Sequence, residues 1–436
     1  MSHPQTYDFL VGTFNTPHLY TIRFTLPPSS STTPKSPAIL KILHRSSAIG
    51  SHSWLHLSPP KSHGTRNLYA TAWTDPPTVV AYAVHSSTQI SLLGTAQTKS
   101  RSGYVCASDV AVYSAGGATG EVFSLDPESG NFVRCPPSSR PTTNGTLSPS
   151  SSTNGQSTSP SSKSLIQPLQ TLSFIDASTQ RDDGSVMDFG GLRHGAHSAD
   201  LSPDGSALYV ADIGRNCIWT FSISPDDGKA SLAEKHISPR ANDGPRHVWP
   251  HPSGGFVYCL QEHTSMVDVF ATSNSGANLH HEQGVRIIPP DQDEGDFWAD
   301  EVRTSLSDGH KPKYLYASTR GLTSEKKGYV AVYKLTEQGR IDTSIPSPYG
   351  ERMNGHKENG KDEMYHGLLC MYETATSGGW ANAIQPGPTV NGVEYLALTD
   401  SEEGWVFVLS WDGQDMKEVA RAKLDEGAGA ATAVWL

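Results

Sequence analysis

The feature that most constrains the fold is a segment pattern that occurs three times with its spacing intact. The copies begin at residues 197, 246 and 301 and read HSADLSPDGSALYVADI, RHVWPHPSGGFVYCLQE and EVRTSLSDGHKPKYLYASTR. Each copy has the pattern of a short strand, a turn rich in Ser, Pro, Asp and Gly, and a second strand that carries a Tyr. This repetition predicts an all-β protein assembled from similar units.

Related strand pairs recur along the whole chain. We count seven, near the start of the chain and at residues 67–84, 110–126, 207–223, 256–272, 314–335 and 394–411. Most of them are spaced near the roughly 40–50 residues that a four-stranded blade occupies. We therefore predict a seven-bladed β-propeller of four-stranded antiparallel blades, a fold that leaves only short, protected sheet edges. A two-sheet β-sandwich is the alternative, but it would not need this internal repeat.

Two polar segments interrupt the pattern. Residues 136–166 are almost wholly Ser, Thr, Pro, Asn and Gly. Such a composition cannot bury enough apolar surface to offset the entropy of ordering, so we predict a disordered surface loop inserted in the third unit. Residues 346–364 form a second polar excursion, which we place before the last blade. Neither segment suggests a domain boundary, and residues 1–436 are predicted to form a single propeller domain.

Composition limits the partners and the compartment. The net charge of −11 and the lack of a Lys/Arg cluster argue against a nucleic-acid surface. The five Cys are odd in number and have no C-x-x-C spacing, which argues against a disulfide framework or a zinc site and favours a reducing compartment. With no signal-peptide pattern and no apolar run of about 18 residues, we expect a cytoplasmic protein without a membrane partner. The sequence leaves the oligomeric state open, a homo-oligomer included.

The repeat also predicts a site. In a propeller blade the first strand lies nearest the axis and the second runs back beside it, so the start of the first and the end of the second share one face. Counted from the glycine of each turn, the first strands open on three different ionisable residues, His197, Arg246 and Glu301. Ionisable side chains that converge in one cleft are the usual mark of a functional site.

The ends of the second strands extend this set. Four residues beyond the shared Tyr lie Glu262 and Arg320, and the last blade places Asp400 there. A structural Arg246–Glu262 ion pair is an alternative, but it does not account for the other ionisable residues at equivalent positions. The sequence has too few clustered His and carboxylates for a metal site and no nucleotide-binding motif in useful context, so we expect neither metal nor cofactor.

These stretches resemble the lactonase-type seven-bladed propellers, a family that includes bacterial 6-phosphogluconolactonases and the fungal carboxy-cis,cis-muconate cyclase. The matching segments are AHSADLSPDGSALYVADIG, DGPRHVWPHPSGGFVYCLQE and LYASTRG, with the upstream Glu301. In the C-terminal quarter, SGGWANAIQP at 377–386 and LTDSEEGWVFVLSWDGQDMKEVARAKL at 398–424 are more similar to the cyclase. The pattern departs from the cyclase at Trp380, where the cyclase has a His.

The resemblance implies a cofactor-free cycloisomerase of aromatic catabolism, in the protocatechuate branch of the β-ketoadipate pathway. Its substrate would be 3-carboxy-cis,cis-muconate and its product a carboxymuconolactone. The family's proposed site of one His, two Arg and one Glu falls on His197, Arg246, Arg320 and Glu262. The two guanidinium groups, with Glu301 beside them, would bind the substrate because Arg recognises carboxylates bidentately. Either His197 or Glu262 would deliver the proton, and we favour His197 with Glu262 as its orienter.

Two other functions stay open. A lactone hydrolase of the 6-phosphogluconolactonase type would use the same residues to polarise a lactone carbonyl and to activate water. A non-enzymatic, protein-binding propeller is also compatible with the fold, since fold does not fix function. However, the sequence lacks WD-type repeats, and protein binding does not need ionisable groups at one mouth. The partner expected for either enzyme is a small-molecule carboxylate or lactone.

Overall fold

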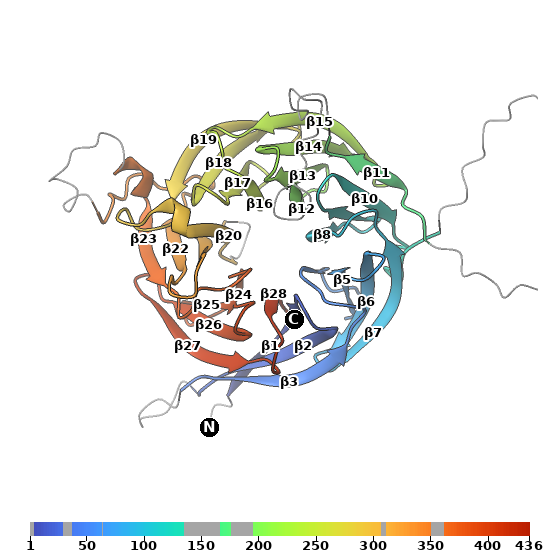
Figure 1. Cartoon of the computed structure of the whole chain (residues 1–436), viewed down its shortest axis with the longest axis horizontal. Helices are drawn as coiled ribbons and strands as arrows, with labels where there is room; N and C mark the ends of the chain where they lie inside the picture. Colours follow the sequence, from blue (N-terminus) through green and yellow to red (C-terminus); the bar gives the residue numbers. More distant parts are fainter. Residues whose placement is uncertain are drawn as a thin grey trace, which may run out of the picture.

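In the computed structural model the chain forms seven four-stranded antiparallel sheets arranged around one axis (Figure 1). The structure describes residues 4–28, 37–62, 64–134, 166–175, 195–306, 311–349 and 362–436. The all-β, seven-bladed propeller predicted from the sequence is confirmed. No helix in this described part of the chain is long and apolar enough to cross a membrane.

The first three blades hold the N-terminal strands and the last strand of the chain. From the axis outwards, blade one contains β28 (Ala430–Trp435), β1 (Gln5–Thr13), β2 (His18–Leu26) and β3 (Ile39–Ser47). Blade two contains β4 (Leu55–Leu57), β5 (Arg66–Ala72), β6 (Thr78–Ser86) and β7 (Gln89–Gln97). Blade three contains β8 (Tyr104–Ala107), β9 (Ala111–Ala115), β10 (Thr119–Ser124) and β11 (Gln170–Ser173).

The other four blades follow in chain order. Blade four contains β12 (Ala196–Leu201), β13 (Ala207–Asp212), β14 (Cys217–Ile223) and β15 (Ala230–Ile237). Blade five contains β16 (Pro245–Pro250), β17 (Phe256–Gln261), β18 (Met266–Ser273) and β19 (Asn278–Arg286). Blade six contains β20 (Phe297–Thr304), β21 (Tyr314–Gly321), β22 (Tyr329–Lys334) and β23 (Leu368–Glu373). Blade seven contains β24 (Ile384–Val390), β25 (Val393–Thr399), β26 (Trp405–Trp411) and β27 (Met416–Lys423).

Blade one is built from both ends of the chain and so closes the ring. The C-terminal strand β28 pairs antiparallel with β1, with Phe9 opposite Trp435 and Leu10 opposite Val434. The C-terminus accordingly lies at the inner side of this blade (Figure 1). The seven strand pairs predicted from the sequence are the middle two strands of the blades, from β1 and β2 to β25 and β26.

The second polar excursion, residues 346–364, lies between β22 and β23 in blade six, and thus before the last blade. Residues 136–166 lie between β10 and β11, in the third blade as predicted. Most of both segments, residues 135–165 and 350–361, falls outside the described residues.

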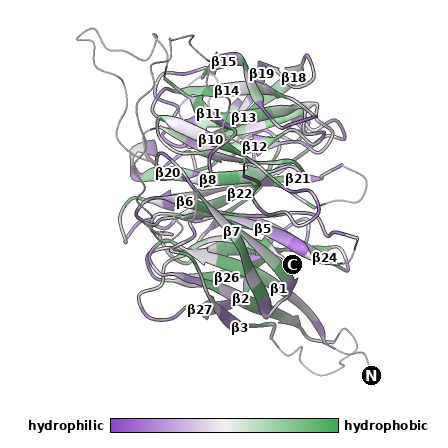
Figure 2. Cartoon of the chain, turned by 90° about the vertical axis from the view of Figure 1, so that its right-hand side faces the viewer, coloured by the Kyte–Doolittle hydropathy of each residue, from purple (hydrophilic) through white to green (hydrophobic). Residues whose placement is uncertain are grey.

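The core lies between neighbouring blades. Apolar residues of adjacent sheets pack face to face, as Leu260 of blade five does with Val302 and Leu315 of blade six. A view from the side shows the hydrophobic residues along the strands and polar residues in the connections (Figure 2). Because each sheet is buried on both faces, the strand ends around the axis are held in fixed positions, which is what a site built from several blades requires.

Candidate active site

The inner strands of blades four, five and six carry the same irregularity at one end. In each, the register with the second strand shifts by one residue, between Ala196 and Ser198 in β12 and between Pro245 and His247 in β16. In β20 the shift lies between Ala299 and Glu301. A β-bulge of this kind inserts one residue and re-aims its side chain. The inserted residues are therefore His197, Arg246 and Asp300.

This register corrects the sequence alignment of the third repeat. Asp300, not Glu301, is the structural equivalent of His197 and Arg246, whereas Glu301 is equivalent to His247. Counting back from the turn glycine failed because the turn between β20 and β21 spans residues 305–313, longer than the turns at 202–206 and 251–255. The strand-end residues Glu262 and Arg320 do fall at equivalent positions. Glu262 directly follows Gln261, the last paired residue of β17, and Arg320 pairs with Trp298 near the end of β21.

The bulged residues face a cavity of about 1630 Å³ on the propeller axis. His197, Arg246, Glu301 and Arg320 all line it, as does Asp300, which the sequence analysis missed. The signal that could have found Asp300 is the acidic pair at 300 and 301, because it offers a second ionisable residue one position before the predicted one. Glu262 does not line the wall and is fully buried behind Arg246.

Arg246 is held by two carboxyl groups. Its Nη1 donates to Glu262, and its Nη2 lies 3.2 Å from Asp300 Oδ1. Its Nε donates to the Asp300 carbonyl oxygen at 3.2 Å. Glu262 therefore orients Arg246, whereas no contact joins it to His197 in the described part of the chain. A buried pair of this type fixes the guanidinium plane rather than adding much net stability.

Arg320 approaches the same carboxyl group from the next strand. Its Nε lies 3.4 Å from Asp300 Oδ1, and its Nη1 donates to the Gly379 carbonyl at 3.0 Å. The guanidinium stacks over the Trp298 ring at 5.0 Å. Asp300 Oδ2 accepts from the Asn382 backbone N–H at 2.9 Å. Burial raises the pKa of Asp300, although both guanidinium groups oppose that shift.

His197 lies beside these two cations. Burial, followed by the positive charges of Arg246 and Arg320, places the pKa of His197 well below its usual value. The imidazole is therefore neutral at neutral pH and can accept a proton or donate one hydrogen bond. The assignment of His197 as proton donor stays a prediction, and this low pKa argues against it in the unliganded protein.

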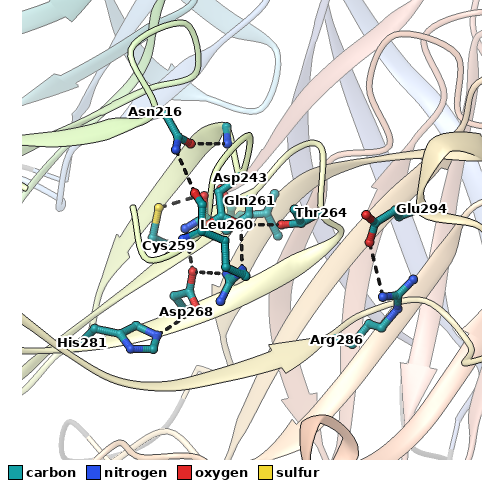
Figure 3. Close-up of polar contacts among 12 residues, drawn as sticks. Asn216, Asp243, Cys259, Leu260, Gln261, Thr264, Asp268, His281, Arg286 and Glu294 are labelled. Atoms are coloured by element: carbon teal, nitrogen blue, oxygen red, sulfur yellow. Dashed lines mark hydrogen bonds and ion pairs between the residues drawn. The ribbon is translucent and has the colours of Figure 1, made fainter. Parts of the chain in front are cut away.

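A polar network in blade five supports the segment that carries Arg246 (Figure 3). Asp243 and Asp268 are fully buried and are bridged by Arg240, at 2.8 Å through Nε and at 2.6 Å through Nη2. Thr264 donates its hydroxyl to Asp243 at 2.8 Å, and the Gln261 side-chain amide donates to Asp268 at 2.7 Å. The network links the loop before β16 to the strand that ends next to Glu262.

The loop reaches Glu262 through a glycine. The Glu262 N–H donates to the Gly244 carbonyl at 2.8 Å, and the His263 N–H donates to Asp243 at 3.0 Å. Gly244 has φ +71, and a Cβ there would lie 2.6 Å from the His263 ring. Only glycine fits this left-handed position without strain. The backbone on both sides of the Arg246–Glu262 pair is thereby fixed.

Two further residues from the sequence analysis, Trp380 and Asp400, differ in their relation to the cavity. Trp380 lines the cavity and is 68% exposed, so it forms part of the rim. Asp400 is buried, and its carboxylate accepts from the N–H groups of Glu402 and Glu403, both at 2.8 Å. Asp400 therefore stabilises a turn instead of joining the cavity wall.

The chain is similar in sequence to a family of β-propellers and to several of its members. Residues 182–348 match the family described as "Lactonase, 7-bladed beta-propeller". Muconate cycloisomerase 1 of Cutaneotrichosporon cutaneum is 35% identical, over 99% of both chains. Carboxy-cis,cis-muconate cyclase of Neurospora crassa is 27% identical, over 55% of this chain and 60% of its own. The 6-phosphogluconolactonase of Klebsiella pneumoniae is 31% identical, over 34% of this chain and 41% of its own.

Solved structures agree with this assignment at the level of the fold. The periplasmic gluconolactonase of Pseudomonas aeruginosa superposes with a TM-score of 0.66, covering 99% of both chains at 15% sequence identity. An identity this low supports the propeller architecture alone. The family match and the full-length match to muconate cycloisomerase 1 together show that the chain belongs to the lactonase family of seven-bladed β-propellers.

Proposed function

We propose that this protein is a lactone-forming cycloisomerase whose substrate is 3-carboxy-cis,cis-muconate. The observation that carries the proposal is the pair of guanidinium groups, Arg246 and Arg320, that meet at Asp300 in the wall of one axial cavity. Two fixed Arg side chains suit a substrate with several carboxylates, because each can bind one of them bidentately. The full-length similarity to a muconate cycloisomerase supports the same reaction class.

The reaction adds one substrate carboxylate across a C=C bond of the same molecule. The carboxylate oxygen forms a C–O bond, the π electrons move to the neighbouring carbon, and that carbon takes a proton. The charge that develops on the adjacent carboxylate during the addition would be stabilised by Arg246 and Arg320. His197, neutral and next to both cations, would donate a hydrogen bond to a substrate oxygen. The product contains every substrate atom and one additional proton.

The test is the ultraviolet absorbance of 3-carboxy-cis,cis-muconate mixed with the purified protein. Loss of the diene band with wild type, and its persistence with Arg246→Ala, is the expected result. Glu402→Gln, which alters an exposed carboxyl on the cavity rim, is the matched control and should react like wild type. An unchanged diene band with wild type would reject the proposal.

Lactone hydrolysis is the second candidate, and the partial similarity to a 6-phosphogluconolactonase favours it. The same Arg residues would polarise a lactone carbonyl, and a phosphorylated sugar lactone would suit two cations. A pH-stat assay with 6-phosphogluconolactone distinguishes the two, because hydrolysis releases acid whereas lactone formation consumes a proton. Acid release without muconate turnover would favour the hydrolase.

A further inference from the structure

A second group of buried polar side chains lies further along the inner strands than the Arg246 group. We call Tyr104, Asp200, His247, Glu301 and Arg303 the floor cluster. They come from β8, β12, β16 and β20, and none of them is more than 8% exposed. Tyr104, His247 and Glu301 also line the axial cavity. The floor cluster is thus in contact with the space in which a substrate would bind.

Arg303 determines the protonation of His247. Its Nη2 pairs with Glu301 Oε1 at 2.6 Å, and its Nη1 lies 3.2 Å from His247 Nε2. The guanidinium is fixed between the rings of Trp249 and Trp54, at 4.2 Å and 5.3 Å. Because a guanidinium can only donate hydrogen bonds, His247 Nε2 must accept there. The His247 imidazole is consequently neutral, with its proton on Nδ1.

The Tyr104 hydroxyl lies between two groups that both accept. It is 2.6 Å from Asp200 Oδ2 and 2.8 Å from His247 Nε2. A phenol has one hydrogen, so with an ionised Asp200 one of these two short contacts would have no proton in it. A proton on Asp200 removes the conflict, since Asp200 then donates to Tyr104 and Tyr104 donates to His247 Nε2, which it shares with the longer contact from Arg303. The geometry therefore favours a protonated Asp200.

The ion pairs around Asp200 also favour its protonated form. Glu301 has a guanidinium partner, whereas in the described part of the chain the ion pair of Asp200 is with His247, at 3.7 Å. Burial raises the pKa of Asp200 to about 7, and Arg303 and the Tyr104 hydrogen bond oppose it. The ionisable groups around Asp200 and its neighbours are Tyr104 and Cys106 on β8, His197 on β12, Arg246 and His247 on β16, Asp300, Glu301 and Arg303 on β20, and His56 on β4.

We propose that Asp200 stores a proton beneath the cavity and that Tyr104 passes it to the substrate during lactone formation. Tyr104 would be a further catalytic residue, and Asp200 would act through it. The Tyr104 ring is held for this role by stacking on Trp54, at 3.8 Å between centroids. The delivery step rests on the function proposed above, whereas proton storage is a property of the unliganded protein.

The step balances without a co-reactant. When the C–O bond forms, the neighbouring carbon takes the Tyr104 hydroxyl proton, and the Tyr104 oxygen takes the Asp200 proton. A free tyrosinate is thereby avoided, which matters because burial holds the pKa of Tyr104 well above its usual value. Asp200 is left as a carboxylate near Arg303 and regains its proton from solvent after product leaves. One proton is consumed for each lactone formed.

Infrared spectroscopy tests storage without any substrate. Wild type should show the C=O stretch of a protonated carboxyl that disappears as the pH rises through about 7. Burial raises the pKa of Glu301 to about 7 as well, so wild type should contain two such carboxyl groups. Asp200→Asn should lose the part of the band that belongs to Asp200, whereas Glu301→Gln should keep this part and lose the other. A band of wild-type intensity in Asp200→Asn, or no such band in wild type, would overturn the inference.

Turnover tests delivery. Tyr104→Phe keeps the ring and removes the hydroxyl, so kcat should fall by about 10²–10⁴-fold with little change in KM, the contribution typical of a general acid. Tyr113→Phe is the matched control, because Tyr113 is buried on the adjacent strand and its hydroxyl donates to the Gly228 carbonyl at 2.9 Å. Wild-type kcat should fall above pH 7, and Asp200→Asn should lose this pH dependence.

The two tests separate the inference from the proposed function. If wild type converts muconate and Tyr104→Phe retains wild-type kcat, the relay is wrong although the function stands. If wild type converts no muconate, the proposed function fails and the infrared titration still decides whether Asp200 stores the proton. Thermal unfolding of each variant verifies that it is folded.

Discussion

The two halves of the cavity wall are built on different blades of the same architecture, and they differ in chemistry. Blades four to six contribute the charged residues of the site, and their inner strands are bulged at the cavity end. The remaining blades contribute mainly small and aromatic side chains, among them Phe14, Trp54, Trp73, Ala383 and Thr432. In blade seven the irregularity of the inner strand lies between Pro386 and Thr389, further from the cavity. In blade one, β28 is also bulged at the cavity end, but the residues it places there are Ala431 and Thr432. The charged wall therefore depends on which residue the bulge presents, and not on the bulge alone.

The largest effect is expected from Arg246→Ala, which removes a central cation of the charged half. The change leaves the fully buried Glu262 without its partner, and breaking a buried ion pair typically costs about 3–5 kcal/mol. Equilibrium urea denaturation should show this loss of unfolding free energy, and muconate turnover should fall to background. The double variant Arg246→Ala/Glu262→Gln should regain stability but not activity. Wild-type stability in the single variant would contradict this account.

A smaller effect is expected from Asp300→Asn. The carboxylate contacts Arg246 and Arg320, and a hydrogen bond to a charged group contributes about 1.5–3 kcal/mol. Both guanidinium groups should lose their fixed orientation, so we expect a higher KM for the muconate together with a lower melting temperature. Glu402→Gln, on the other half of the wall, should change the melting temperature little. Equal effects of the two substitutions would show that the halves do not differ as described.

Acid should lower the free energy of unfolding through the buried His52. Burial lowers the pKa of His52 from 6.5 to about 4, so below pH 6.5 the unfolded chain binds a proton that the folded protein does not. Stability from this group is complete above pH 6.5 and declines as the pH falls, by about 2 kcal/mol at pH 5. Urea denaturation at pH 7.5 and 5 should therefore show a smaller acid-induced loss in His52→Gln than in wild type.

A buried carboxyl with a raised pKa should give the opposite dependence of stability on pH. Because the pKa of Asp200 is raised from 3.8 to about 7, its contribution to stability is complete below about pH 3.8, declines as the pH rises, and is lost above about pH 7. Relative to wild type, Asp200→Asn should accordingly gain stability at pH 7.5 and keep only a smaller part of that gain at pH 5. The same denaturation series measures it, and a pH-independent difference would reject the raised pKa.

The smallest effect is expected at the aromatic rim. Trp380 is 68% exposed, so Trp380→Ala should change the unfolding free energy by less than about 0.5 kcal/mol. Its place in the cavity wall predicts a change in KM of a few-fold with kcat retained. Leu232→Ala, which truncates another exposed apolar side chain on β15, is the control and should leave KM unchanged. A large fall in kcat with Trp380→Ala would mean that the aromatic half takes part in the reaction.

The propeller and most of the charged wall could be predicted from the sequence. Seven strand pairs with alternating apolar residues are enough to specify seven blades, because period-2 burial and turn glycines are local properties. The equivalence of Glu262 and Arg320 followed from the same spacing. The axial placement of His197, Arg246 and Arg320 then needed only the general geometry of a blade.

Which of two acidic neighbours takes the bulge position was decided by the tertiary structure alone. A bulge shifts every later side chain by one position, so Asp300 and Glu301 exchange roles although the sequence around them is regular. The strand register also places Asp200 and Arg303 at equivalent positions, opposite Tyr209 and Tyr316, although counting from the turn glycines sets them one residue apart. Tyr104 joins them from blade three. The protonation of the floor cluster depends on burial and on which hydrogen-bond donors meet which acceptors, and these are properties of the folded ring rather than of any one segment.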